Sequence, residues 1–133
     1  VIYLDGRIET EESNPALAAQ RQLFPSHSAF LDWARCSAGF PASQRQYDDL
    51  DVTLIWLQER LSELAPIDGV IGFSQGANMA SLLAAQAELG GGVPFRFVIH
   101  ACAAGPGWIE QRPELFQQKL KMPSLHISGA ADE

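Results

Sequence analysis

The strongest constraint on the fold is a serine flanked by two glycines, Gly72-Phe73-Ser74-Gln75-Gly76, where a predicted strand meets a predicted helix. The apolar run at 70–73 predicts a short strand, and the Ala- and Leu-rich run at 75–89 predicts the helix that follows it. A serine at such a junction must lie in a sharp, strained turn. Such a turn lifts the hydroxyl above the carboxyl end of a sheet, where open α/β sheets bind ligands.

The chemistry that suits this turn is nucleophilic catalysis. We predict that Ser74 is the nucleophile and that Gly72 and Gly76 are the glycines of a nucleophile elbow, because side chains there would collide with the neighbouring strand and helix. The backbone N–H of Gln75 would be one donor of an oxyanion hole, at a helix N-terminus that favours negative charge. The alternative is an ordinary tight turn in which Ser74 only caps the helix.

Strands alternate with helices along the rest of the chain. The sequence predicts strands at 1–4, 70–73, 95–101 and 124–128, and helices from 16 to before 25, at 48–65, at 75–89 and as one short helix within 113–121. The helix at 48–65 is the clearest, because its leucines recur at steps of four and three: Leu50, Leu54, Leu57, Leu61 and Leu64. This alternation predicts an α/β fold with a parallel sheet and crossover helices, whose apolar strands are buried on both faces.

Charge and cysteine content exclude several classes of partner. Nine basic residues against 16 acidic ones give a net charge of −7, with no basic cluster, which argues against nucleic acid or an anionic membrane as a partner. Cys36 and Cys102 lie far apart and form no metal-binding spacing, so the sequence predicts no disulfide framework and favours a reducing compartment such as the cytoplasm. No apolar run approaches the roughly 18 residues of a membrane span, and the motifs imply no metal or organic cofactor.

A serine nucleophile needs a base, and the base needs an acid that orients it. In hydrolases with this strand–turn–helix motif the acid follows the serine along the chain. Asp132 comes just after the predicted strand 124–128 and Gly129, so it would lie at the same carboxyl edge of the sheet as Ser74. We therefore predict Asp132 as the acid, with Glu133 as the fallback; a turn aspartate without catalytic role is the alternative.

The base is harder to place, because a histidine should follow the acid and none does. His27 falls in an irregular loop and His126 in mid-strand. His100 ends a strand near the carboxyl edge, but a satisfied histidine close to the core is the simpler interpretation. We expect the base outside residues 1–133, together with the second N–H of the oxyanion hole, whose loop would precede Val1.

Four further side chains deserve a comparison of roles. Cys102 could be a second nucleophile at the sheet edge, but nothing predicts a base beside it, and free cysteines are commonly buried. The tryptophans are more consistent with packing than with a carbohydrate platform, and Trp108 is a candidate for lining an acyl pocket: Trp33, Trp56 and Trp108.

Several stretches together resemble a known family. The runs "YLDG" at 3–6, "YDDLD" at 47–51, "DGVIGFSQGANMASLLAA" at 68–85 and "PSLHISGAADE" at 123–133 are similar to the FSH serine hydrolases of the α/β-hydrolase superfamily. "GFSQGA" alone also occurs in acyl-protein thioesterases and carboxylesterases. Residues 67–70, which lead into the strand before this motif, and the preceding helix with "YDDLD" favour FSH. The segment Asp5 to Gly39 departs from the Pro-rich loop expected after "LDG".

The resemblance implies an α/β-hydrolase-type parallel sheet with crossover helices, truncated at both ends, and a single partial domain over residues 1–133. It implies Ser74 as nucleophile, Asp132 as acid and a histidine in a later segment. The expected function is a serine esterase or thioesterase that acts on a small-molecule acyl ester or thioester through a Ser-Asp-His triad, with residues 1–133 alone weakly active or inactive. The alternative is a non-catalytic binding or scaffold module with the same fold.

Overall fold

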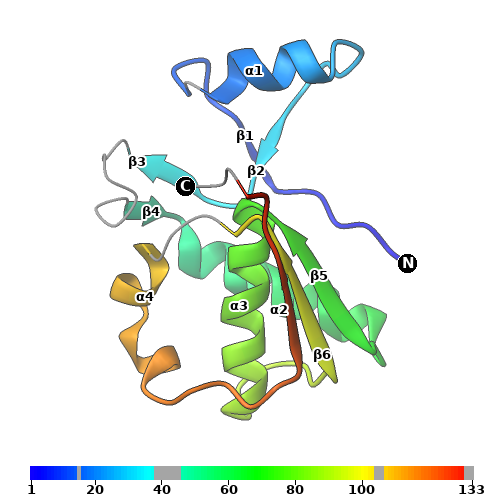
Figure 1. Cartoon of the computed structure of the whole chain (residues 1–133), viewed down its shortest axis with the longest axis vertical. Helices are drawn as coiled ribbons and strands as arrows, with labels where there is room; N and C mark the ends of the chain where they lie inside the picture. Colours follow the sequence, from blue (N-terminus) through cyan, green and yellow to red (C-terminus); the bar gives the residue numbers. More distant parts are fainter. Residues whose placement is uncertain (15, 38–45, 104–106, 131–133) are drawn as a thin grey trace.

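A three-stranded parallel sheet forms the centre of the molecule. The computed structural model describes residues 1–14, 16–37, 46–103 and 107–130. The strand order is β5–β6–β7, with β5 at Gly69–Phe73, β6 at Phe97–Ala101 and β7 at Ser124–Ile127. The crossover from β5 to β6 is the helix α3 (Gln75–Glu88), as parallel pairing requires (Figure 1). The predicted parallel sheet with a crossover helix is confirmed.

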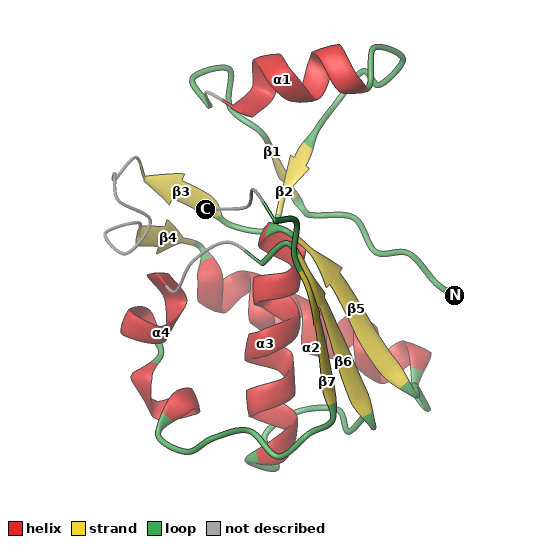
Figure 2. Cartoon of the chain, viewed as in Figure 1, coloured by secondary structure: helices red, strands yellow, loops and turns green. Residues whose placement is uncertain are grey.

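Leucine-rich helix faces supply the core. Helix α3 packs against β5 and β6, and the helix α2 (Leu50–Leu64) packs against α3 (Figure 2). Four of the five leucines of the predicted stripe on α2 are buried: Leu50, Leu54, Leu57 and Leu61. From α3 the core takes Met79, Ala80, Leu82, Leu83 and Ala84. Burying a leucine fully contributes about 1.5–3 kcal/mol, so this helix pair anchors the α3 N-terminus where Ser74 lies.

Only one face of the sheet is covered. Val98 and His100 point toward α3 and are 2% and 5% exposed. On the other face Ile71 and Phe73 are 64% and 70% exposed, and the side chains of β7 are exposed as well. The expectation that the strands are buried on both faces is therefore wrong for the described residues, because β5 and β6 meet a helix on one side only and β7 packs mainly against β6.

The N-terminal part contains short antiparallel pairs rather than a strand at 1–4. Residues 1–7 form no strand, and the Val1, Ile2 and Tyr3 side chains are exposed, so that prediction is wrong. A strand needs a hydrogen-bonded partner, and residues 1–7 pair with no strand of the described residues. Instead β1 (Ile8–Glu9) pairs with β2 (Leu31–Asp32).

The predicted helix after Asn14 is present as α1 (Ala16–Leu23), and the Asn14 side chain accepts a hydrogen bond from the Ala16 N–H at 3.0 Å. The chain after α1, for which no helix or strand is predicted up to residue 47, contains β3 (Arg35–Ser37), which pairs with β4 (Gln46–Asp48). The strand β4 takes up Asp48, so the helix predicted over 48–65 begins only at Leu50.

The connection from β6 to β7 differs from the predicted single helix within 113–121. It contains a short helix, α4 (Gly107–Gln111), and a 3₁₀ turn at Pro113–Phe116. Pro113 explains the break, because it lacks the N–H that would continue α4. The connection packs Trp108, which is 3% exposed, against Tyr47 with ring centroids 4.7 Å apart.

Candidate active site

Ser74 lies in a strained turn between β5 and α3. Its φ is 51° and its ψ is −120°, a backbone conformation that a residue with a Cβ rarely adopts. Such a conformation costs on the order of 1–3 kcal/mol and persists only where surrounding structure enforces it. The enforcement is visible, because the Ser74 N–H donates to the Ala101 carbonyl at 2.8 Å and the Ala77 N–H donates to the Ser74 carbonyl at 3.0 Å. The predicted strand-to-helix turn is confirmed.

The Ser74 hydroxyl makes no capping hydrogen bond to α3. This observation argues against the alternative in which the serine is only a helix cap, because the oxygen of a capping serine accepts a hydrogen bond from an N–H group of the first turn. Ser74 is half-buried.

The two glycines of the motif are required by close packing around the turn. A Cβ on Gly72 would lie 2.2 Å from the Gly76 carbonyl oxygen and 2.5 Å from the Ala77 Cα. A Cβ on Gly76 would lie 3.2 Å from Nε1 of Trp33. Gly72 therefore lets α3 start directly above β5, and Gly76 lets the Trp33 indole approach the same turn.

Replacing Gly72 with alanine is expected to lower the free energy of unfolding by about 3 kcal/mol or more, because the atoms that the new methyl meets are backbone atoms that cannot rotate away. Gly91→Ala is the matched control, since a Cβ there would lie 3.8 Å from the Gln86 carbonyl oxygen. The control is expected to stay within about 0.5 kcal/mol of the unmodified protein. Urea unfolding of both variants gives the comparison, and equal stability would show that the turn is not tightly packed.

Three strand ends meet at the edge that carries Ser74. The strands are parallel, and the Cys102 N–H donates to the Ile127 carbonyl at 2.7 Å, so β6 and β7 end side by side next to the turn. Gln75 is the first residue of α3, and its N–H is one of the first four of the helix, which have no acceptor within it. This edge therefore combines a serine hydroxyl, an unpaired helix N–H and the chain that leaves β7.

The predicted acid and its fallback, Asp132 and Glu133, lie outside the described residues. The structure carries the chain from the end of β7 at Ile127 to residue 130, starting from the same edge as Ser74. The roles of Asp132 and Glu133 stay predictions.

The three histidines do not contact Ser74 through any hydrogen bond of the described residues. His100 is 5% exposed; its Nε2 lies 3.2 Å from the Ser81 Oγ and its Nδ1 lies 3.3 Å from the Nδ1 of His126. His126 is exposed and also contacts the Ser124 hydroxyl at 3.3 Å. His27 is exposed and lies between the rings of Phe24 and Phe30. The interpretation of His100 as a satisfied histidine near the core is confirmed.

This histidine pair is expected to make stability depend on pH. Burial, reinforced by the neighbouring His126, lowers the pKa of His100 below its ordinary value of 6.5. The unfolded chain therefore binds the proton first as pH falls, and stability is expected to decrease from pH 6.5 down to the folded-state pKa. One proton contributes at most about 1.4 kcal/mol per pH unit. Thermal unfolding between pH 5 and pH 8 measures this slope; an equal slope in His100→Gln would show that another group causes it.

Cys102 and the tryptophans all contact neighbouring parts of the fold. Cys102 has a φ of 49° directly after β6 and bonds to β7 through its N–H. Trp33 and Trp56 pack with ring centroids 6.4 Å apart. Trp108 lies in the core, which supports packing over the suggested role in an acyl pocket.

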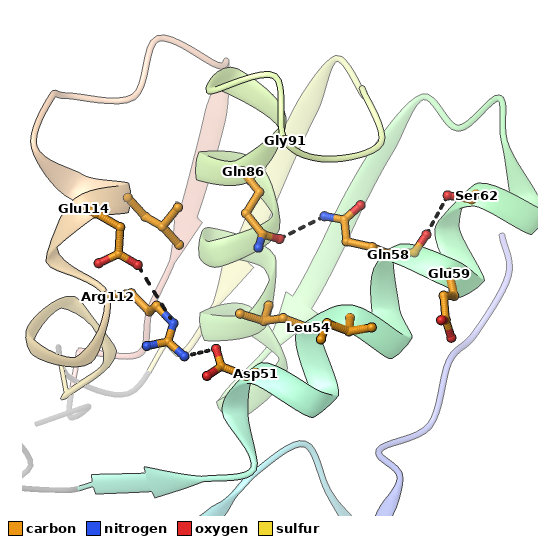
Figure 3. A pocket seen from close by; sticks show the side chains of 11 residues that line it. Asp51, Leu54, Gln58, Glu59, Ser62, Gln86, Gly91, Arg112 and Glu114 are labelled. Carbon is orange, nitrogen blue, oxygen red and sulfur yellow. Dashed lines mark hydrogen bonds and ion pairs between the residues drawn. The ribbon is translucent and has the colours of Figure 1, made fainter.

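A surface cavity of about 990 Å³ lies between α2, α3 and the segment after α4 (Figure 3). Its polar side chains satisfy one another, because Arg112 pairs with Asp51 and Glu114, and the Gln58 amide donates to Gln86 at 2.9 Å. It borders the C-terminal half of α3, whereas Ser74 precedes the N-terminus, so it is separate from the candidate active site.

Two further searches cover the described residues only. No group of three or more His, Cys, Asp or Glu side chains could hold a metal ion there. In the same part of the chain, no helix combines the length and apolar character that crossing a membrane requires.

The geometry defines a class of protein. A parallel sheet with crossover helices, and a serine in a positive-φ turn between strand and helix at its carboxyl edge, is the arrangement of α/β-hydrolases. A family model described as serine hydrolase (FSH1) matches residues 1–133, and the chain belongs to that family.

Curated relatives share this part of their sequences. Esterase OVCA2 of Homo sapiens is 34% identical over 87 residues, which are 63% of this chain and 38% of that protein. Esterase FPY3 of Fusarium mangiferae is 46% identical over 87 residues, 57% of this chain and 39% of that protein. Rhodanese-like domain-containing protein 6 of Arabidopsis thaliana is 35% identical over 98 residues, 73% of this chain and 16% of that protein. The matched part thus spans less than two fifths of each relative. No solved structure matches the chain significantly.

One contact of the site could not have been foreseen from the motif. The Gln75 side chain bonds to the backbone of Trp33 and Ala34, 42 and 41 residues earlier in the chain. No local pattern connects these positions, and only the folded chain brings them together.

Proposed function

We propose that this chain carries the nucleophile of a serine hydrolase that cleaves carboxylic esters or thioesters of small to medium acyl groups. The observation that carries the proposal is the Ser74 turn, which holds a strained serine at the carboxyl edge of the sheet without using its hydroxyl as a helix cap. Membership of the serine hydrolase family and the esterase names of two relatives support the same chemistry.

In this mechanism the Ser74 Oγ attacks the acyl carbonyl carbon while a histidine takes the hydroxyl proton. The carbonyl oxygen becomes an oxyanion, and the Gln75 N–H donates to it at the positive end of the α3 dipole. One such donor contributes roughly 3 kcal/mol to transition-state stabilisation. The histidine then gives the proton to the departing alcohol or thiol, which leaves the acyl group on Ser74. In the second half, a water molecule gives a proton to the histidine and attacks the acyl carbonyl carbon; the carboxylic acid is released, and the histidine returns the proton to the Ser74 Oγ.

We propose that the histidine of this mechanism is none of the three in residues 1–133: His27 is exposed beside the rings of Phe24 and Phe30, in the segment after α1. The ring of His100 is engaged by Ser81 and His126 on the face of the sheet that α3 covers, and His126 contacts Ser124. We place the general base, and the second oxyanion donor, outside these 133 residues. Asp132 would accept the N–H of that histidine and hold its tautomer, with Glu133 as the fallback.

The test is a panel of p-nitrophenyl esters with acetyl, butyryl, octanoyl and palmitoyl groups, plus butyryl and octanoyl thioesters. The protein is expressed from its complete coding sequence. Saturable hydrolysis is expected for the small and medium acyl groups. If no ester or thioester is turned over, and binding of a non-hydrolysable acyl analogue is still observed, the chain is a binding module and the proposed reaction is wrong.

A further inference from the structure

Two side chains hold the backbone of Trp33 and Ala34, which join β2 to β3. The Gln75 Oε1 accepts from the Trp33 N–H at 2.6 Å and lies 3.4 Å from the Ala34 nitrogen. The Gln75 Nε2 donates to the Ala34 carbonyl at 2.8 Å, and the Thr53 hydroxyl donates to the Trp33 carbonyl at 2.7 Å. All four backbone polar groups of this dipeptide are thereby engaged by side chains.

These contacts are well placed to be strong. Thr53 and Ala34 are both 0% exposed, and Gln75 and Trp33 are half-buried, so the access of water to these hydrogen bonds is reduced. A glutamine amide presents an acceptor and a donor side by side, as a peptide group does, and can therefore pair with a strand-like backbone. A carboxylate in its place could accept both N–H groups but could not donate to the Ala34 carbonyl.

We call the hydrogen bonds from Gln75 and Thr53 to the backbone of Trp33 and Ala34 the clamp. The clamp holds the Trp33 indole next to the turn of the candidate active site. Gln75 follows Ser74 directly, and the Trp33 Nε1 lies 3.2 Å from the position of a Cβ on Gly76. Trp33 is half-buried, and its ring packs against the ring of Trp56. The absence of a Cβ on Gly76 thus lets a large aromatic ring pack against a residue that follows Ser74 by two positions in the chain.

We infer that Gln75 is a positioning residue whose side chain holds Trp33 against the Ser74 turn. We also infer that the Trp33 indole limits the size of the acyl group accepted beside Ser74, and this second step rests on the function proposed above. Gln75 then acts twice. Its backbone N–H faces the oxyanion, and its side chain fixes one wall of the acyl site.

The first measurement is selectivity, the ratio of kcat/KM for p-nitrophenyl octanoate to that for the acetate. Trp33→Ala is expected to raise this ratio roughly tenfold, because a pocket wall discriminates acyl size by that order. Gln75→Ala is expected to shift the ratio in the same direction. The double variant should show no more than the effect of Trp33→Ala alone, because both changes remove the same wall.

The second measurement does not depend on activity. Amide hydrogen exchange at Trp33 and Ala34 is expected to become at least about tenfold faster in Gln75→Ala, since the clamp that protects these N–H groups is gone. Gln75→Glu keeps the acceptor for both N–H groups but turns a carboxylate oxygen toward the Ala34 carbonyl, so its exchange should lie between that of the unmodified protein and that of Gln75→Ala. Gln58→Ala is the matched control, because Gln58 also accepts from a backbone N–H, that of Val93 at 2.9 Å, but borders the other half of α3. It should change neither exchange at Trp33 and Ala34 nor the acyl ratio.

The outcomes separate the two proposals. If hydrogen exchange at Trp33 and Ala34 is unchanged in Gln75→Ala, the clamp is wrong. If that exchange is faster in Gln75→Ala but the ratio of kcat/KM for octanoate to acetate is unchanged in Trp33→Ala, the specificity role of Trp33 is wrong. If the unmodified protein hydrolyses no ester, the proposed function fails and the specificity role fails with it. The exchange measurement then still decides whether Gln75 holds the Trp33 segment.

Discussion

Ser74→Ala is expected to lower kcat/KM for p-nitrophenyl butyrate by at least about 10⁴-fold, because removing the nucleophile of a triad leaves only the contribution of the oxyanion donors and of substrate binding. The fold should survive. The serine hydroxyl makes no capping hydrogen bond to α3, so the unfolding free energy should change little. A parallel urea titration checks that the loss of turnover is not a loss of structure.

Ser81→Ala is the control for this experiment. Ser81 lies on the same helix, and its hydroxyl is 3.2 Å from the Nε2 of His100, so it is the residue that a search for a serine–histidine pair would select. Its contact is with a buried histidine on the covered face of the sheet, and we expect its removal to leave kcat within about threefold of the unmodified value. Loss of turnover in Ser81→Ala, with Ser74→Ala active, would move the nucleophile to Ser81.

Asp132→Asn is the second variant with a large expected effect, a loss of about 10⁴-fold in kcat. An amide at this position would stabilise the wrong tautomer of the histidine and could not stabilise the imidazolium that forms during attack. The chain reaches Asp132 from β7, whose end lies beside the end of β6 and the Ser74 turn. The position of the strand end, rather than any contact of Asp132, supports this expectation.

Glu133→Gln separates the two adjacent acids. We expect a change of less than about tenfold in kcat for this variant, because a solvated carboxylate next to a catalytic acid acts only through screened charge. The reverse pattern, with Glu133→Gln inactive and Asp132→Asn active, would make Glu133 the acid. Comparable activity in both variants would show that neither acid serves the base.

Local patterns in the sequence predicted the parts of the structure that local physics determines. The turn at Ser74, the leucine stripe of α2 and the strands β5, β6 and β7 each follow from side-chain periodicity and from glycines placed where the chain must bend. The buried role of His100 also followed from its place in an apolar strand.

Long-range pairing was beyond the reach of those patterns. The run at 1–4 has the composition of a strand but finds no partner, and the exposed face of β5 shows that apolar residues need not be covered on both sides. The clamp from Gln75 to Trp33 and Ala34 spans more than 40 residues, and a glutamine at a helix start carries no local mark of such a partner. Asp132 stays a prediction that rests on the order of strands and acids along the chain.

The most direct test of the central claim, that Ser74 is an activated nucleophile, is covalent labelling with a fluorophosphonate probe followed by peptide mass mapping. An unactivated serine is a weak nucleophile at neutral pH, so labelling reports activation and not mere exposure. The account predicts one labelled peptide, which contains Ser74, with the label lost in Ser74→Ala and kept in Ser81→Ala. A label on another serine, or labelling that persists unchanged in Ser74→Ala, would contradict it.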